Sequence, residues 1–300
     1  MGLLDSIKSA LKSGGGKSGG KIDVEGRFHR ERTAFTGTMA NFFIAKDREH
    51  DDRRVGVKVV DPEKSQQFEA RFKGLKKPSE GEIAMQMKHP KVVETYEYGT
   101  SLKGEPVVVM EYIAGPSMQN IVVQKLEDPV RGKRLMLIRD MAESLVYVHE
   151  KEFIHRDICP RNFICLPGVT GVKLIDFGLT VPATPPFMQP GNRTGTPLYM
   201  SPEIVRRRAT DKRVDIFSFG VTCFCLLAFE HPWQGQVLNG RAALSHDTRP
   251  PKDIFTLLPN IDPRLGKAVM SALDPKVDDR TGSMKTFLSQ IEKSDHEFQN

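Results

Sequence analysis

One carboxylate and one carboxamide lie five positions apart in a stretch that cannot form a regular helix. Asp157 and Asn162 flank Pro160, which interrupts helical hydrogen bonding. Asp176 follows the apolar run 172–175, which is typical of a strand and would carry a second carboxylate to the same place. Asp157 can accept a proton from a hydroxyl group, and the other two side chains offer oxygens to a hard cation such as Mg²⁺. A base beside two metal ligands suits phosphoryl transfer, whose catalysis depends mainly on positioning and charge neutralisation.

The order of these residues resembles the catalytic and metal-binding loops of protein kinases. The matching stretches are His155-Arg156-Asp157 with Asn162, and Asp176-Phe177-Gly178. The resemblance extends over residues 28–293. It implies an α+β, bilobal protein kinase-like fold with a small β-rich N-lobe and a larger helical C-lobe. The expected divisions are an N-terminal segment and linker at 1–27, an N-lobe at 28–112, a C-lobe at 115–293 and a tail at 294–300.

By this resemblance, the chain is expected to be a serine/threonine protein kinase that uses ATP and Mg²⁺ to phosphorylate proteins. Gly195 to Glu203 resembles the substrate-docking loop of that type, with Ser201 in place of the family alanine. The implied roles are Asp157 as base, Asn162 and Asp176 as Mg²⁺ ligands, Lys58 as phosphate clamp and Glu80 as its partner. Lys58 ends Val55-Gly56-Val57-Lys58, which is similar to the family's lysine strand.

The nucleotide flap departs from the family pattern. In the segment 35–40 only the middle glycine, Gly37, is kept, while Phe35 and Ala40 stand where the family has glycine. A weaker and stiffer flap is therefore expected. Phe42 and Gly56 also replace family residues, and we expect the phenyl ring to fill the space above adenine that Gly56 vacates.

Other nucleotide contacts follow from the resemblance alone. The apolar run that begins at Pro106 is expected to be a strand with Met110 as the gatekeeper. The Glu111 carbonyl and the Ile113 amide would bind adenine, and Ser117 stands where many relatives place an acidic residue for the ribose. The nucleotide-site residues assigned in this way are Gly37, Ala40, Phe42, Lys58, Glu80, Glu111, Ile113, Ser117 and Ile164.

One departure concerns the charge beside the base. Most serine/threonine kinases have lysine at the position of Cys159. We expect Arg161, two residues further on, to supply that charge near the transferred phosphate, because a guanidinium can bind it through two hydrogen bonds. A reactive thiol is the alternative for Cys159, and a packed, inert cysteine is the commoner case.

Arg156 suggests regulation by phosphorylation, because a buried guanidinium favours an anion. Thr194 is the first candidate for autophosphorylation and Thr184 the second. Solvated threonines without this role are the alternative.

Apolar periodicity predicts the helices that support these loops. Residues 63–88 are expected to be helical with a new start near Pro78, and Glu80 is preferred to Glu82 as the partner of Lys58. Further helices are expected over 133–150, 211–229 and 264–292. The resemblance also implies that Asp215 anchors the catalytic loop and that Arg280 pairs with Glu203.

Composition fits a soluble protein of a reducing compartment. Hydrophobic residues make up 39% and charged residues 27% of the chain, and four cysteines show no CxxC spacing. The net charge of +6 is too diffuse to indicate nucleic-acid binding. With no apolar stretch long enough to span a bilayer and no secretory signal, a cytoplasmic location is expected.

Residues 1–12 place Leu3, Leu4, Ile7 and Leu11 on one helical face, and 13–20 form a Gly/Ser-rich linker. The helix could contact a membrane surface or a partner, and Met1-Gly2 with Ser6 also fits an acylation pattern. A loosely ordered start, or a helix packed on the N-lobe, is the favoured alternative.

Two other functions remain open at this point. The altered glycine loop and Cys159 suit a pseudokinase that acts as a scaffold or binds nucleotide, whereas the complete set from Lys58 to Asp176 argues against it. A small-molecule kinase of similar fold is disfavoured by the docking loop at 195–203.

Overall fold

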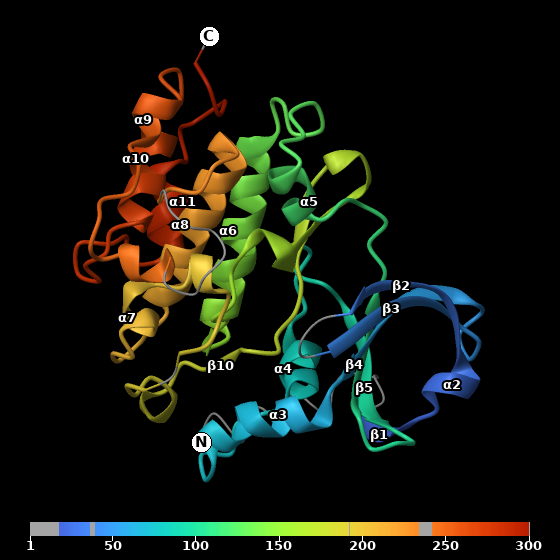
Figure 1. The fold of residues 1–300 in the computed structure, drawn as a ribbon. Coiled ribbons are helices and arrows are strands. Elements are labelled where there is room, and N and C mark those ends of the chain that lie inside the picture. Colours follow the sequence, from blue (N-terminus) through green and yellow to red (C-terminus); the bar gives the residue numbers. More distant parts are fainter. Residues whose placement is uncertain (1–17, 37–39, 192, 234–241, 300) are drawn as a thin grey trace. The chain divides into compact units, whose positions relative to one another are not determined.

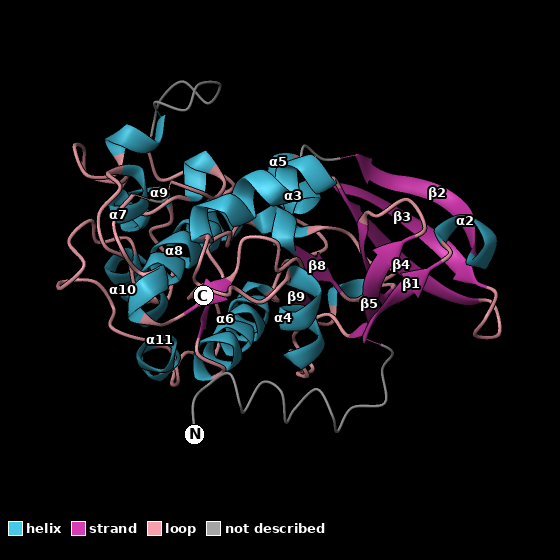
Figure 2. Cartoon of the chain, turned by 90° about the horizontal axis from the view of Figure 1, so that it is seen from below, coloured by secondary structure: helices cyan, strands magenta, loops and turns pink. Residues whose placement is uncertain are grey.

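Strands dominate the first part of the chain and helices the second, as the colours of Figure 2 show. The computed structural model describes residues 18–36, 40–191, 193–233 and 242–299. The chain divides into two compact units, Met1–Tyr112 and Ile113–Asn300. The expected α+β class, with a strand-rich first unit and a helical second unit, is confirmed.

In the described part of the first unit, six strands form one twisted sheet in the order β1-β5-β6-β4-β3-β2. β1 runs parallel to β5, and the other neighbours pair antiparallel. The strands, labelled as in Figure 1, are β1 Ser18–Ile22, β2 Phe28–Thr36, β3 Ala40–Asp47, β4 Arg53–Val60, β5 Thr95–Ser101 and β6 Pro106–Glu111.

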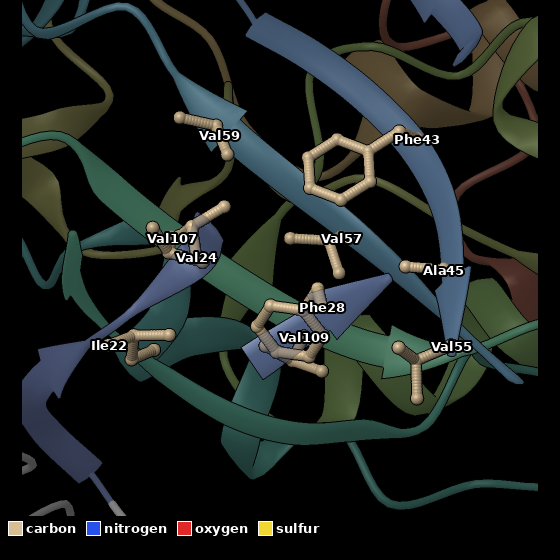
Figure 3. Close-up of a cluster of buried hydrophobic side chains, with 10 residues drawn as sticks. All are labelled: Ile22, Val24, Phe28, Phe43, Ala45, Val55, Val57, Val59, Val107 and Val109. Atoms are coloured by element: carbon tan, nitrogen blue, oxygen red, sulfur yellow. The ribbon is translucent and has the colours of Figure 1, made fainter. Parts of the chain in front are cut away.

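The two faces of this sheet carry different side chains, because successive side chains along a strand point to opposite faces. On β4, Val55, Val57 and Val59 point to a buried apolar cluster, drawn in Figure 3. Gly56 and Lys58 therefore point to the opposite face. The cluster in Figure 3 comprises Ile22, Val24, Phe28, Phe43, Ala45, Val55, Val57, Val59, Val107 and Val109.

The prediction of a flexible linker over 13–20 is wrong at its end, because Ser18 to Gly20 belong to β1. Gly99 permits this pairing, because a Cβ on this residue of β5 would lie only 2.3 Å from the carbonyl oxygen of Gly20. The sheet therefore includes residues before Phe28, the expected start of the domain. Strand pairing across such a long stretch of chain leaves no local signal in a Gly/Ser-rich segment.

A short helix, α2 (Val24–Arg27), follows β1 and is held to the sheet by buried charges. Arg27 Nε donates to Asp47 Oδ1 at 2.8 Å, and Arg27 Nη1 donates to Glu97 Oε2 at 2.7 Å. All three side chains are buried, so the ion pairs fix α2 against β3 and β5.

The predicted helix over 63–88 is interrupted. α3 covers Pro62–Glu69 and continues as a 3-10 helix over Ala70–Phe72, and α4 covers Glu80–Gln86. The chain leaves helical geometry only between Phe72 and α4. Positive φ angles at Gly74 and Lys76, together with Pro78, explain the break. The expected new start is confirmed: Ser79 caps α4, and Glu82 completes a capping box by accepting the Ser79 amide at 2.7 Å.

Helices form most of the second unit. α8 packs against α6 and α10, and α11 packs against α6, in the arrangement seen in Figure 1. In the described residues of this second unit the α-helices are α5 Met118–Val123, α6 Arg134–Glu150, α7 Pro202–Val205, α8 Arg213–Ala228, α9 Ile254–Leu257, α10 Pro263–Ala272 and α11 Met284–Gln290. The predicted helices over 133–150 and 211–229 are confirmed as α6 and α8, and the closing helices as α10 and α11.

The side-chain patterns explain α6 and α8. The side chains of α6 that recur at spacings of three and four are buried, namely Leu135, Ile138, Met141, Leu145 and Val148. α8 is buried on every side from Val214 to Leu227. A helix that is apolar all round belongs in a core. No helix among the described residues is long and apolar enough to cross a membrane.

Four short strands carry the loops of the second unit. β7 (Phe153–Ile154) pairs with β10 (Val181–Pro182), and β8 (Phe163–Cys165) pairs with β9 (Val172–Leu174), both antiparallel. Residues 1–17 lie outside the described part of the chain, and so do Gly37 and the N-terminal helix expected over 1–12.

Candidate active site

The β8–β9 hairpin brings Asn162 and Asp176 together. Phe163 and Leu174 are opposite each other in its register, and the Ile175 amide donates to the Asn162 carbonyl at 2.9 Å. Asn162 and Asp176 therefore lie at the same end of the hairpin. Asp176 has a positive φ of 69°, and its Oδ1 accepts the Gly178 amide at 2.9 Å. That turn fixes the direction of the carboxylate.

Asp157 lies beside Asn162. The side-chain nitrogen Nδ2 of Asn162 donates to the main-chain carbonyl of Asp157 at 2.7 Å and to Asp157 Oδ2 at 3.0 Å. These bonds assign the amide orientation, and they turn the Asn162 oxygen away from Asp157. Both carboxylates, Asp157 and Asp176, also interact electrostatically with Arg161. The second unit thus gathers the expected base and the two expected metal ligands.

Thr196 is a site residue that the sequence analysis missed. Asp157 Oδ1 accepts hydrogen bonds from the Thr196 amide at 2.9 Å and from its hydroxyl at 2.7 Å. Arg161 Nη2 also donates to this hydroxyl at 3.0 Å. The signal was present, because Thr196 stands in the docking-loop stretch, but nothing local shows that its hydroxyl reaches Asp157.

Asp215 of α8 anchors the catalytic loop through the loop's backbone amides, as the resemblance implied. Its carboxylate accepts the amides of His155 and Arg156, both at 2.8 Å, and is 2.9 Å from His149 Nε2. Burial alone would raise the pKa of Asp215, but these hydrogen bonds keep it below its usual value. Because Asp215 is fully buried, replacing it would leave two buried amides without acceptors.

The ring of His155 contacts Phe177 edge to face, with centroids 5.4 Å apart. Both side chains are buried, and burial lowers the pKa of His155, so the ring is neutral at neutral pH. The contact joins Phe177, which follows Asp176, to His155, which lies two residues before Asp157.

Arg161 and Cys159 differ sharply in exposure. The Cys159 thiol is buried, and burial raises its pKa to about 12, so it is inert at neutral pH. The alternative of a reactive thiol at this position is therefore wrong. Arg161 is half exposed, and besides its bond to Thr196 it lies 3.4 Å from Asp157 Oδ2.

Arg156 is buried and only partly satisfied. Its Nη2 donates to the Phe187 carbonyl at 2.6 Å and to Thr210 Oγ1 at 3.2 Å. Nε and Nη1 have no hydrogen-bond partner among the described residues, and burial lowers the pKa of Arg156 to about 10. A guanidinium in this state gains stability from a nearby anion.

In the first unit, Lys58 Nζ donates to Glu80 Oε1 at 2.6 Å, so the expected pair is formed. Period-two alternation places Lys58 on the face opposite the apolar cluster, and α4 presents Glu80 from its first turn. Ile83 and Met87, which follow Glu80 at helical spacing, are both fully buried. Glu82, the alternative partner, is used in the capping box instead.

Phe42 and Gly56 fit each other as expected. A Cβ on Gly56 would lie 2.6 Å from Phe42 Cζ and 3.3 Å from Met110 Cγ. Phe42 is opposite Lys58 in the β3–β4 register, so the phenyl ring and the lysine share one face. The space that an alanine would need is occupied by the ring.

The remaining nucleotide-site residues stay predictions. Ala40 is the first residue of β3, and Ile164 of β8 is bridged to Ser117 through the backbone. The Ser117 hydroxyl caps α5 by accepting the Asn120 amide at 3.2 Å. Glu111 ends β6, and Ile113 begins the second unit.

The segment after Thr196 is anchored to the helical core. Arg280 binds Glu203 through two hydrogen bonds of 2.8 and 2.9 Å, and both side chains are buried. The pairing that the resemblance implied is confirmed, and it holds α7 in place.

The chain belongs to the protein kinase domain family, whose model matches residues 28–296. Its relatives include serine/threonine-protein kinase pkn2 of Myxococcus xanthus, 30% identical over 220 residues, which are 71% of this chain and 25% of that protein. Serine/threonine-protein kinase PknB of Mycobacterium tuberculosis is 32% identical over 207 residues, 66% of this chain and 32% of PknB. Serine/threonine-protein kinase PrkC of Bacillus subtilis is 28% identical over 217 residues, 71% of this chain and 32% of PrkC. The matched region thus spans about a quarter to a third of each relative.

Proposed function

We propose that this protein kinase domain is an ATP-dependent serine/threonine kinase that transfers the γ-phosphate of Mg-ATP to protein hydroxyls. The relatives that are named serine/threonine-protein kinases support this class. The observation that carries the proposal is the arrangement at the β8–β9 hairpin, where backbone pairing brings Asn162 and Asp176 together and the Asn162 side chain binds Asp157.

Asp157 would act as the base. Its carboxylate already accepts a hydrogen bond from the Thr196 hydroxyl at 2.7 Å, which is the contact that a substrate serine or threonine would need. The proton of the attacking hydroxyl would pass to Asp157 as the oxygen bonds to phosphorus and ADP leaves. Arg161 would hold the charge of the transferred group.

The donor set fits Mg²⁺. Asn162 supplies a neutral oxygen and Asp176 a carboxylate, and Mg²⁺ commonly takes one or two such ligands together with phosphates and water. Phosphate oxygens of the nucleotide would complete the coordination. When bound, the metal neutralises phosphate charge.

In the first unit, Lys58 would bind the α- and β-phosphates, oriented by Glu80. Phe42 would cover adenine, and the Glu111 carbonyl and Ile113 amide would bind its edge. The Ser117 hydroxyl already caps α5, which supports a lesser role for it at the ribose.

We also propose that phosphorylation regulates the chain, at Thr194 or Thr184. The partly satisfied guanidinium of Arg156 supports this, since a phosphate would give it an anionic partner. Thr184 begins the turn whose Phe187 carbonyl Arg156 contacts. Mass spectrometry after incubation with Mg-ATP tests both sites, and absence of phosphate from both would refute the proposal.

A pseudokinase is the second candidate. The buried Cys159 in the usual lysine position and the altered glycine loop favour it. The two candidates differ in turnover and not in nucleotide binding, so binding of ATP alone does not separate them. A cytoplasmic location remains a prediction for either.

The decisive experiment is transfer of ³²P from γ-labelled ATP to a generic protein substrate. Asp157→Asn should reduce the rate by about 10²–10⁴-fold, because it removes the base and keeps the shape. Asp128→Asn is the matched control, since Asp128 is exposed and pairs only with Arg131 among the described residues. ATP binding without transfer in the wild type would establish the pseudokinase, and transfer only to small molecules would exclude a protein kinase.

A further inference from the structure

Three consecutive main-chain carbonyls in the expected docking loop each accept a hydrogen bond from a distant side chain. The bonds run from His231 Nε2 to Leu198 O at 2.8 Å, from Ser218 Oγ to Tyr199 O at 2.6 Å and from His246 Nδ1 to Met200 O at 2.8 Å. We call Ser218, His231 and His246 the carbonyl clamp. Because every donor is a side chain, each could be changed without altering the loop's own sequence.

The hydrogen bonds define the tautomer of each ring. A carbonyl oxygen only accepts, so His231 carries its proton on Nε2 and His246 on Nδ1. The other nitrogen of His231 accepts the Trp233 amide at 3.3 Å, whereas Nε2 of His246 has no partner among the described residues. Burial lowers the pKa of both rings, that of His246 to about 4, so both are neutral donors at neutral pH.

The rings are held in place by packing. His246 is fully buried, with its ring centroid 4.4 Å from that of Trp233 and 5.5 Å from that of Phe217. His231 stacks on His246 at 6.0 Å. Trp233 is in turn fixed by a bond of 2.9 Å from Nε1 to the Arg249 carbonyl. The clamp is therefore part of a rigid aromatic cluster.

The clamped carbonyls lie between two other fixed points. On one side is Thr196, bound to Asp157, and on the other is Glu203, bound to Arg280. With its carbonyls engaged by the clamp, the turn at 197–199 leaves Pro197 exposed. A displacement of this turn would move the Thr196 hydroxyl relative to the Asp157 carboxylate, and small displacements are costly in catalysis.

We propose that the carbonyl clamp holds residues 196–200, part of the expected docking loop, in the geometry that receives the protein substrate, with His231 and His246 as positioning residues. This inference rests on the proposed protein kinase function and goes beyond it by assigning two histidines far along the chain to substrate binding. Neither histidine contacts the substrate hydroxyl in this proposal; each acts through a loop carbonyl.

The test compares two substitutions of the same residue. His246→Leu removes the donor, and His246→Asn retains an N–H group near the position of Nδ1. With a serine-containing peptide as substrate, the leucine variant should raise the KM for peptide about tenfold, more than it raises the KM for ATP. The asparagine variant should recover most of that loss. Thr248→Ala, a nearby exposed change outside the clamp, should match the wild type.

An unchanged peptide KM in His246→Leu would overturn the proposal, and so would equal losses in the leucine and asparagine variants. If the leucine variant does not fold, His231→Leu and His231→Gln give the same comparison at Leu198, since glutamine can place an N–H group near the position of Nε2.

If the wild type transfers no phosphate, the proposed function fails, and hydrogen exchange of the amides of 198–201 then tests whether the clamp holds the loop. Faster exchange in the leucine than in the asparagine variant supports it, and equal exchange refutes it.

Discussion

At the scale of single residues, the charge beside Asp157 comes from a side chain in an unusual place. Cys159 is buried and cannot provide a cation, whereas Arg161 reaches both the Thr196 hydroxyl and the Asp157 carboxylate. Local sequence identified Arg161 as the substitute, but only the folded loop shows that Thr196 is its second partner. The group around the base is therefore a set of three mutually bonded side chains.

Arg161→Ala should lower kcat by roughly tenfold to a hundredfold, because it removes one charged hydrogen bond near the reacting groups. Steady-state kinetics with protein substrate would measure the effect. Arg161→Lys keeps the charge but not the planar donor pair, so its rate should be intermediate. A kcat equal to that of the wild type in the alanine variant would leave Arg161 as a surface residue.

Gly56→Ala should weaken ATP binding, because the added methyl group would lie 2.6 Å from the Phe42 ring. Overpacking of this kind costs about 1–3 kcal/mol, and the same cost at the nucleotide site would correspond to roughly fivefold to 150-fold in affinity. Isothermal titration with ATP is the measurement.

The double variant Phe42→Val/Gly56→Ala is the control for this pair, since a smaller side chain makes room for the methyl group. It should recover affinity beyond the sum of the single effects. Additive losses, or undiminished affinity in Gly56→Ala, would show that the two residues are not matched in size.

At the scale of elements, β1 is held to the sheet by the close approach of two backbones, and α2 is held to it by buried ion pairs. β1 has no alternating apolar pattern, and Gly99 accommodates its neighbour because it lacks a Cβ. Arg27 then ties α2 to Asp47 and Glu97. The strand and the helix together close the apolar cluster of Figure 3 through Ile22 and Val24.

Gly99→Ala should detach β1, because its Cβ would lie 2.3 Å from the Gly20 carbonyl oxygen. Hydrogen exchange of the amides of 20–22 should become faster, and unfolding in urea should show a loss of about 1–3 kcal/mol. Gly20→Ala is the matched control, since a Cβ there meets nothing within 4 Å and should be tolerated. Equal protection of β1 in both variants would contradict the close-approach account.

At the scale of the whole molecule, buried ionisable groups make stability depend on pH. The folded pKa of His246 is lowered from 6.5 to about 4 by burial, so the unfolded chain binds this proton more readily. Stability from this group is therefore fully present above about pH 6.5 and is lost as the pH falls toward 4. His155 and His231 have lowered pKa values for the same reason and act in the same direction.

The free energy of unfolding should accordingly fall between pH 6.5 and 4, with roughly 3 kcal/mol due to His246. Urea titrations at several pH values in this range measure the slope. His246→Asn has no titrating ring, so its slope should be smaller than that of the wild type. Identical slopes would mean that His246 is not a buried neutral group.

The sequence by itself determined the fold class, the main helices and the order of the chemical groups. Apolar residues at 3.6-residue spacing mark α6, a mostly apolar run marks α8, and motif spacing pointed to Asp157, Asn162 and Asp176. These signals are local, so each can be found without knowing what the segment contacts.

Only the tertiary structure decided the pairings between distant segments. β1 pairs with β5 because Gly99 lacks a Cβ, and Thr196 reaches Asp157. The carbonyl clamp holds residues 198–200 through side chains that come much later in the chain. Such contacts depend on backbone approach and on the direction of single hydrogen bonds, which leave no periodic pattern in a sequence. The physical reason is that a hydrogen bond needs its two atoms within about 3 Å in the right direction, and only the packed chain sets that distance.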